Sequence, residues 1–227
     1  MTVMISPNPD KQLADVIAVR AAQILLNHGS HVLMREELQA SCNTMGVSYL
    51  PEKECLQQAD VILTIGGDGT ILHEANLTLE YKKPILGVNL GRCGFLATCE
   101  VDEMETKLAA VARGEYSLDS RMLLYARVLG EDNWKGHALN DVVVTKGRLQ
   151  QAIDFSIYCD DILVEHYRGD GVIVATPTGS TAYSLAYPGL PDQGHCGNAH
   201  LPPQPCQPRY GIRTGAQDQH LCRAGGR

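Results

Sequence analysis

Three features are missing from this 227-residue chain, and each missing feature excludes a class of protein. No run approaches the ~18 apolar residues that a membrane-spanning helix needs. The amino terminus has no basic leader, and its apolar run is too short for a secretion signal. None of the eight cysteines stands at CxxC spacing, and no histidine pair has the spacing of a metal site. We therefore expect a cytoplasmic protein whose cysteines are reduced thiols that mostly pack in the interior.

Positive charge is scarce as well, because 19 lysines and arginines stand against 26 aspartates and glutamates, giving a net charge of −7. That balance argues against a nucleic acid bound through its phosphates, since such binding relies on a surplus of Lys and Arg. A phosphorylated small ligand would instead be held locally by backbone amides and a few arginines. The hydrophobic fraction of 44% is typical of a globular core, and the length suits one large domain or two small ones.

Strands and helices alternate over the first 115 residues. Short apolar runs predict strands at residues 3–5, 31–34, 61–65 and 84–89, and apolar residues at helical spacing predict helices over 11–27, 71–79 and 101–113. In the second of these helices, Leu72, Ala75 and Leu79 share the predicted apolar face. Such alternation is typical of parallel βαβ units, so we expect an α/β domain, a parallel sheet with flanking helices, over residues 1–115.

The pattern changes after residue 118 and again near Pro188. Strands separated by Gly and Asp turns are predicted at 122–129, 138–144, 152–159, 161–165 and 172–175, with no helix between them. We therefore expect a β-rich second domain over residues 116–187. The last forty residues hold six of the eleven prolines and show no strand or helix period, so residues 188–227 are expected to form a disordered tail.

A glycine-rich turn, GGDGT at residues 66–70, follows the predicted strand at 61–65 and opens the next helix. A strand, a glycine turn and a helix in this order present unpaired backbone N–H groups to a phosphate. An aspartate in such a turn is repelled by phosphate unless it binds a metal or takes a proton from a nucleophile. Those are the two needs of phosphoryl transfer to an alcohol. Glycine doublets also occur in plain turns, and that interpretation stays open for the isolated motif.

Three further runs carry polar groups at strand ends. A second glycine run, NLGRCGFL, occupies residues 89–96, and Asn140 and Asp141 precede the apolar run 142–144. The third run leads from GDG at 169–171 through a strand into TPTGSTAY at 176–183. Small hydroxyl residues at a strand-to-helix turn suit hydrogen bonding to sugar and phosphate. Taken alone, these runs are also compatible with ordinary turns and a helix cap.

Together with Asn8 and Pro9, these runs resemble the NAD kinase family, in the same order, over residues 1–187. GGDGT is shared with lipid kinases and phosphofructokinases, whereas TPTGSTAY after GDG points to NAD kinases. The resemblance implies an α/β N-terminal domain, a β-rich C-terminal domain and an NAD site between them that involves a neighbouring subunit. It also implies transfer of the γ-phosphoryl of ATP to the 2′-hydroxyl of the adenosine ribose of NAD. A divalent metal ion, Mg²⁺, would take part, and the intact protein would be a homo-oligomer with no nucleic-acid or membrane partner.

The resemblance also assigns roles to individual positions. Asp68 would accept the proton of the 2′-hydroxyl, and Asn140 and Asp141 would bind the nicotinamide-side ribose and nearby groups. Asp170, with Arg168 close by, would contact the second nucleotide portion, while residues 178–183 would line the adenine and its ribose. The residues expected to bind NAD or ATP are Gly66, Gly67, Gly69, Thr70, Asn140, Asp141, Arg168, Asp170, Thr178, Gly179, Ser180, Thr181, Ala182 and Tyr183. No residue is assigned to the metal.

The chain departs from the family pattern after TGSTAYSLA at residues 178–186. The family continues with a run near AGGPI and a strand ending in TPICPHSL, and neither is present. Codons permitted for residues 197–213, read from the second base, encode VTPICPHSLANRGMVF. This mapping suggests that residues 188–227 come from a shifted reading frame and that the β-rich domain is incomplete. Two alternatives to an active NAD kinase stay open: an inactive, partly folded remnant, or a lipid or small-alcohol kinase that shares GGDGT.

Overall fold

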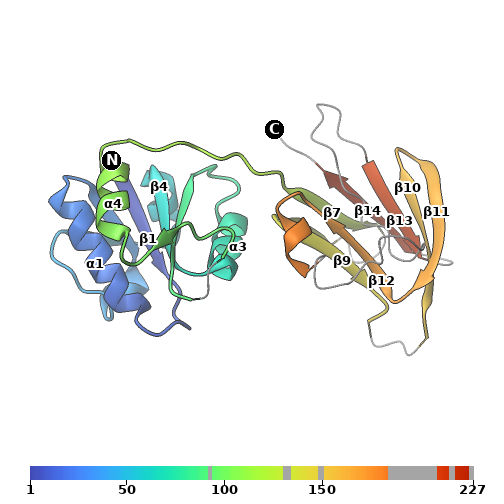
Figure 1. Ribbon diagram of the computed structural model, residues 1–227, viewed down its shortest axis with the longest axis horizontal. Coiled ribbons are helices and arrows are strands. Elements are labelled where there is room, and N and C mark those ends of the chain that lie inside the picture. The colour runs from blue at the N-terminus through green and yellow to red at the C-terminus, as the bar shows by residue number, and fades with distance from the viewer. Residues whose placement is uncertain (92–93, 130–133, 148–150, 184–208, 215–217, 225–227) are drawn as a thin grey trace. The chain divides into compact units, whose positions relative to one another are not determined.

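The computed structural model of the chain divides into two compact units, Met1–Asp119 and Ser120–Arg227 (Figure 1). The structure describes residues 1–91, 94–129, 134–147, 151–183, 209–214 and 218–224, and for the last two segments the backbone alone. The division lies close to the boundary expected near residue 116. The first unit contains one sheet and the second contains two, and each unit has its own buried core.

The first unit is built on a six-stranded parallel sheet in the order β3-β2-β1-β4-β5-β6. Its strands are β1 (Thr2–Pro7), β2 (His31–Arg35), β3 (Val47–Leu50), β4 (Val61–Gly66), β5 (Ile85–Asn89) and β6 (Cys99–Glu100). Its helices are α1 (Ala14–Asn27), α2 (Glu52–Gln58), α3 (Asp68–Leu77) and α4 (Met104–Ala112), with a 3₁₀ turn at Glu36–Gln39. The strand order reverses between β1 and β4, and ligands bind at the carboxyl ends of strands at such a switch point. The expected α/β architecture is confirmed.

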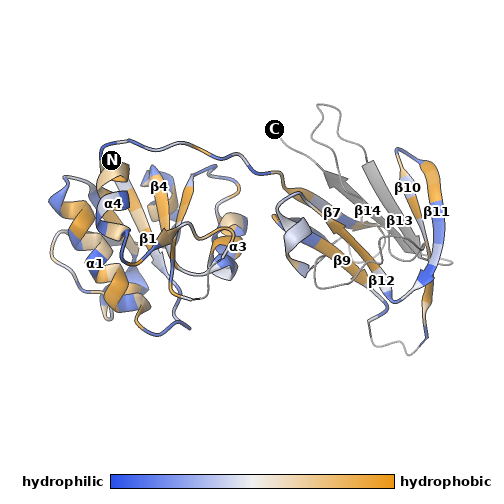
Figure 2. Cartoon of the chain, viewed as in Figure 1, coloured by the Kyte–Doolittle hydropathy of each residue, from blue (hydrophilic) through white to orange (hydrophobic). Residues whose placement is uncertain are grey.

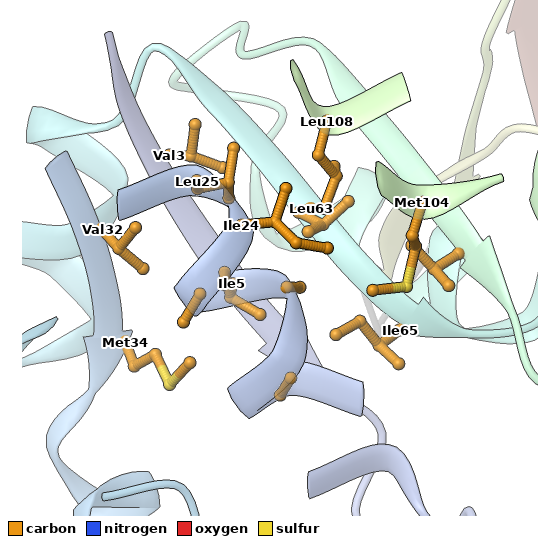
Figure 3. Close-up of a cluster of buried hydrophobic side chains, with 14 of the residues drawn as sticks. Val3, Ile5, Ile24, Leu25, Val32, Met34, Leu63, Ile65, Met104 and Leu108 are labelled. Carbon is orange, nitrogen blue, oxygen red and sulfur yellow. The ribbon is translucent and has the colours of Figure 1, made fainter. Parts of the chain in front are cut away.

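Strands β1 and β4 are apolar over most of their length (Figure 2). This composition suits strands that helices cover on both faces of the sheet. On one face, Ile24 of α1 and Leu108 of α4 pack around Leu63 and Ile65 of β4 (Figure 3). On the opposite face, Leu56 of α2 belongs to a second buried cluster. Burial of β4 along its whole length fixes the position of the glycine turn that follows it.

Besides the 3₁₀ turn, three elements of this unit were not expected from the sequence: β3, α2 and β6. Each of the three is short: β6 has two residues, β3 has four and α2 has seven. A segment of that length carries too few apolar residues to show a period, and α2 buries only Cys55 and Leu56. These elements form because neighbouring strands and helices offer partners, which local sequence does not reveal.

The second unit consists of two antiparallel sheets. Its strands are β7 (Leu124–Leu129), β8 (Lys135–Ala138), β9 (Asp141–Thr145), β10 (Ile153–Cys159), β11 (Ile162–Gly169), β12 (Gly171–Ala175), β13 (Arg209–Thr214) and β14 (Asp218–Ala224). Six of them form a sheet in the order β11-β10-β13-β14-β7-β8, and β9 pairs with β12 as a two-stranded ribbon. Phe155 and Ile157 of β10 share a buried cluster with Val172 and Val174 of β12. The expected β-rich second domain is confirmed.

Two features of this unit differ from the sequence expectations. The strand expected at 138–144 is two strands, β8 and β9, because the chain leaves one sheet at Ala138 and joins the other at Asp141. The tail expected to lack strands contains β13 and β14, which lie between β10 and β7. Backbone pairing with existing strands can select an extended conformation that weak side-chain alternation does not signal. Residues 184–208 lie outside the described part of the chain, so the expected shift of reading frame is not tested.

The described cysteine thiols act mainly as packing groups. Cys42, Cys55 and Cys99 are free and buried, and Cys159 is free and half-buried. Burial raises the pKa of the Cys99 thiol to about 11, which keeps the nucleophilic thiolate scarce at neutral pH. Within the described ranges, no helix is long and apolar enough to cross a membrane.

Candidate functional site

The GGDGT turn connects the buried strand β4 to α3. Gly66 ends β4, Gly67 caps the helix and Asp68 is its first residue. Thr70 Oγ1 accepts hydrogen bonds from the Gly67 N–H at 3.3 Å and from Asn8 Nδ2 at 3.0 Å. A Cβ atom at Gly66 would lie 2.1 Å from that same oxygen, so the turn closes only around glycine. The first amides of α3 have no partner within the helix, which makes this end suitable for a phosphate.

The Asp68 carboxylate faces the loop that follows β5. Its Oδ2 accepts the N–H of Phe95 at 2.8 Å, and its Oδ1 accepts those of Leu96 and Ala97, both at 3.0 Å. The loop begins with Leu90, whose N–H donates to Gly66 O at 2.6 Å. The two glycine runs of the first unit therefore form one structure, a contact that the sequence did not indicate.

In the second unit, Asn140 lies in the short connection between β8 and β9. Its backbone oxygen accepts the Thr176 N–H at 2.8 Å, and Thr176 Oγ1 donates to Leu139 O at 2.6 Å. A Cβ atom at Gly179 would lie 2.0 Å from the Asn140 backbone oxygen. The glycine of TPTGSTAY is therefore required by direct contact with the Asn140 turn, and the structure brings these two predicted motifs together.

Two side-chain oxygen atoms in this turn are buried and receive no hydrogen bond from the residues that the structure describes. Neither Asn140 Oδ1 nor Asp141 Oδ2 has a hydrogen-bond partner within the part of the chain that the structure describes. Burial raises the pKa of the Asp141 carboxyl, and a backbone hydrogen bond from Tyr183 acts in the opposite direction. A buried acceptor without a donor is costly, so these atoms point to a ligand that brings hydroxyl or amide groups.

Asp170 and Arg168 occupy different surroundings from the Asn140 turn. Asp170 Oδ1 forms an ion pair with Lys146 Nζ at 2.8 Å, and Arg168 Nε lies 3.9 Å from Asp154 Oδ1. Because β9 and β12 are antiparallel, Asp170 stands at the opposite end of their ribbon from Asp141. The predicted binding residues of the second unit therefore fall into two groups at the two ends of one ribbon.

Some residues that shape these sites were missed from the sequence. Thr176 is fully buried and joins the Asn140 turn to Gly179, whose N–H donates to Thr176 Oγ1 at 3.0 Å. Arg121 Nη1 donates to Thr178 Oγ1 at 3.3 Å, and nothing in the local sequence indicated this contact. For Gly94, the only signal was its place in the second glycine run.

Metal ligation has no preformed cluster in the described residues, since no group of three or more His, Cys, Asp or Glu side chains could hold an ion there. Both oxygens of Asp68 are engaged by backbone amides.

Two family models match the chain. The ATP-NAD kinase N-terminal domain matches residues 3–116, and the ATP-NAD kinase C-terminal domain matches residues 139–190. NAD kinases from Azotobacter vinelandii and Caldanaerobacter subterraneus are each 38% identical, over 177 and 190 residues, which are 77% and 81% of this chain. Those alignments cover 60% and 65% of the two relatives, so the chain spans less than two thirds of their length.

Two solved structures share the fold. Yeast NADH kinase complexed with NADH matches with a TM-score of 0.82 at 22% identity, over 98% of this chain and 79% of that one. An NAD kinase from Archaeoglobus fulgidus in complex with ATP matches with a TM-score of 0.65 at 20% identity, over 99% of this chain and 90% of that one. With both domain models matched in order and half of the chain covered by the first, this chain belongs to the NAD kinase family.

Proposed function

We propose that this chain is an NAD kinase that transfers the γ-phosphoryl group of ATP to the 2′-hydroxyl of the adenosine ribose of NAD, giving NADP and ADP. The observation that carries the proposal is the position of Asp68, a carboxylate on the first residue of α3, directly after a diglycine turn at the switch point of the sheet. An anion site beside a carboxylate suits transfer of a phosphoryl group to an alcohol.

In the proposed reaction, the 2′-oxygen of the ribose forms a bond to the γ-phosphorus while the bond from that phosphorus to the β–γ bridging oxygen breaks. Asp68 accepts the proton of the 2′-hydroxyl, and ADP leaves. The amides at the start of α3 bind the phosphate groups. Mg²⁺, entering with ATP, would compensate charge on the moving phosphoryl group.

The two buried side-chain oxygens of the Asn140 turn support a sugar-bearing molecule as the substrate that receives the phosphoryl group. Asn140 Oδ1 and Asp141 Oδ2 would accept hydrogen bonds from ribose hydroxyls or from an amide of NAD. Gly179 lies against the same turn, and together with the preceding Thr178 it would contribute to the nucleotide site. The yeast relative was solved with NADH and the Archaeoglobus relative with ATP, the two ligand types that the proposal needs. A homo-oligomer in the cytoplasm belongs to the same proposal.

The test is an assay of the purified full chain with ATP and Mg²⁺ against a panel of NAD, NADH and diacylglycerol, with NADP measured by an NADP-specific dehydrogenase. We expect phosphorylation of NAD and no phosphorylation of diacylglycerol. Phosphorylation of the lipid alone would favour the lipid-kinase alternative. A rise of the melting temperature with NAD but no turnover would identify a folded, inactive remnant, because a ligand that binds the folded state raises that temperature.

A further inference from the structure

The Asp68 carboxylate is held by three consecutive backbone N–H groups, those of Phe95, Leu96 and Ala97, at 2.8–3.0 Å. An ionised carboxylate offers about four acceptor positions, so three of them are occupied. Hydrogen bonds to an ionised group are stronger than neutral ones. The side chain is therefore fixed in one orientation by the loop after β5 and not by its own helix.

Gly94 immediately precedes these three donors and lies against the carboxylate. A Cβ atom at this position would stand 2.3 Å from Asp68 Oδ1, 2.7 Å from Cγ and 2.9 Å from Oδ2. The position of Asp68 therefore requires a glycine at residue 94. The reason is space, because any side chain at 94 would displace the Asp68 carboxylate or move the loop off it.

The loop is anchored at its start. Asn89, 3% exposed, donates from Nδ2 to Glu100 Oε1 at 3.1 Å, and its Oδ1 accepts the Gly91 N–H at 3.1 Å. Together with the bond from the Leu90 N–H to Gly66 O, these contacts tie the loop to β4, β5 and β6. Because the donors belong to the backbone of an anchored loop, they can hold the carboxylate in a fixed position.

We propose that Gly94 and the amides of residues 95–97 form a clamp that positions the Asp68 carboxylate for the incoming hydroxyl, which makes Gly94 a positioning residue of the phosphoryl transfer. The role of Gly94 in the reaction rests on the proposed function, whereas the hydrogen bonds of the clamp are independent of it. The carboxylate points where the loop holds it, and the acceptor position that remains is the one available to a substrate hydroxyl. Misplacement of a catalytic group by about 1 Å can cost ~100-fold in rate.

A double-mutant cycle on the melting temperature of the full chain tests the clamp. Gly94→Ala should lower the melting temperature by about 3–10 °C, since overpacking expels the carboxylate from its donors. In the Asp68→Ala background the same change should have less than about a third of that effect, because the atoms that a Cβ would meet are gone. Gly91→Ala is the matched control in the same loop, where the nearest heavy atom to a Cβ would be 3.9 Å away. Its effect should stay within about 1 °C.

Equal losses in both backgrounds, or no loss from Gly94→Ala, would overturn the clamp. If Gly94→Ala alone does not fold, recovery of folding in the double variant supports the clamp and failure to recover overturns it.

In the kinase assay, Gly94→Ala should lower kcat about 10- to 100-fold with KM for NAD within about twofold, whereas Gly91→Ala should match the unchanged chain. A higher kcat in Gly94→Ala would mean that the loop restrains Asp68 instead of positioning it. A chain without any turnover would contradict the proposed function, and the melting cycle would still decide the clamp.

Discussion

The guanidinium of Arg35 forms an ion pair with the Glu74 carboxylate, whose side chain is 2% exposed. Ser6 Oγ donates to the same Glu74 oxygen, and Arg35 Nη2 donates to Ser6 Oγ at 3.0 Å. Glu52 completes the group at 3.0 Å from Arg35 Nε. These contacts tie α3 to β1 and β2, so a buried charge network supports the helix that begins with Asp68.

Replacing Arg35 with Met should lower the free energy of unfolding of the first unit by about 2–4 kcal/mol, because Glu74 would stay buried without its counter-charge. Chemical denaturation followed by circular dichroism measures this loss. Arg113→Met is the control, since its pair with Glu115 is exposed and should contribute little. Equal losses in the two variants would show that the Arg35 pair has no special importance.

The pair of Arg35 with Glu74 also explains why the buried face of α3 was predicted wrongly from the sequence. The predicted apolar face of the second predicted helix, at residues 71–79, contained Leu72, Ala75 and Leu79, yet the buried side chains of α3 are Thr70, Ile71 and Glu74. A buried glutamate breaks the apolar period, and its partners come from residues far away in the chain. The GGDGT and TPTGSTAY motifs could be found because each is local. The clamp on Asp68 and the contact of Gly179 with Asn140 could not, because they join segments about 30–40 residues apart.

The contact of Gly179 with Asn140 predicts a strong effect of a single methyl group. Gly179→Ala should destabilise the second unit by about 1–3 kcal/mol and weaken NAD binding, because a Cβ would force the Asn140 turn away from its position. Thermal melting and NAD titration measure the two effects. Gly169→Ala provides the control, since a Cβ there meets nothing within 4 Å. A Gly179→Ala chain as stable as the Gly169→Ala chain would contradict this contact.

Asp141 should make stability depend on pH. Because burial raises its pKa in the folded state, its contribution to stability is fully present below the ordinary value of 3.8 and is lost as the pH rises through the raised value. Asp141→Asn should therefore raise the melting temperature at pH 7 by about 1–4 °C, and the gain should shrink as the pH is lowered toward 4. Asp154→Asn, at an exposed position, is the control. A gain that is the same at all pH values would exclude titration of Asp141 as its cause.

Asp68→Asn should lower kcat far more than it weakens NAD binding. Loss of a general base costs about 10²–10⁴-fold in rate, whereas Asn keeps the size of the side chain. Steady-state kinetics with varied NAD separate the two quantities, and Asn140→Ala and Asp170→Ala serve as comparisons that should mainly raise KM for NAD. An unchanged kcat in Asp68→Asn would remove Asp68 from the catalytic role.

Amide hydrogen exchange distinguishes two accounts of the last forty residues. In the structure, β13 pairs with β10 and β14 pairs with β7, so their backbone N–H groups should exchange more slowly than those of a free peptide. The amides of β4, which is central and buried throughout, set the upper limit of protection. A shifted reading frame would instead have produced a sequence never selected to complete this sheet, and residues 209–224 would then exchange at the free-peptide rate and be cut first by a protease. We expect protection over β13 and β14, because without them β10 and β7 would each lose a neighbouring strand and leave open edges. Free-peptide exchange over both segments would contradict that pairing and support the shifted frame.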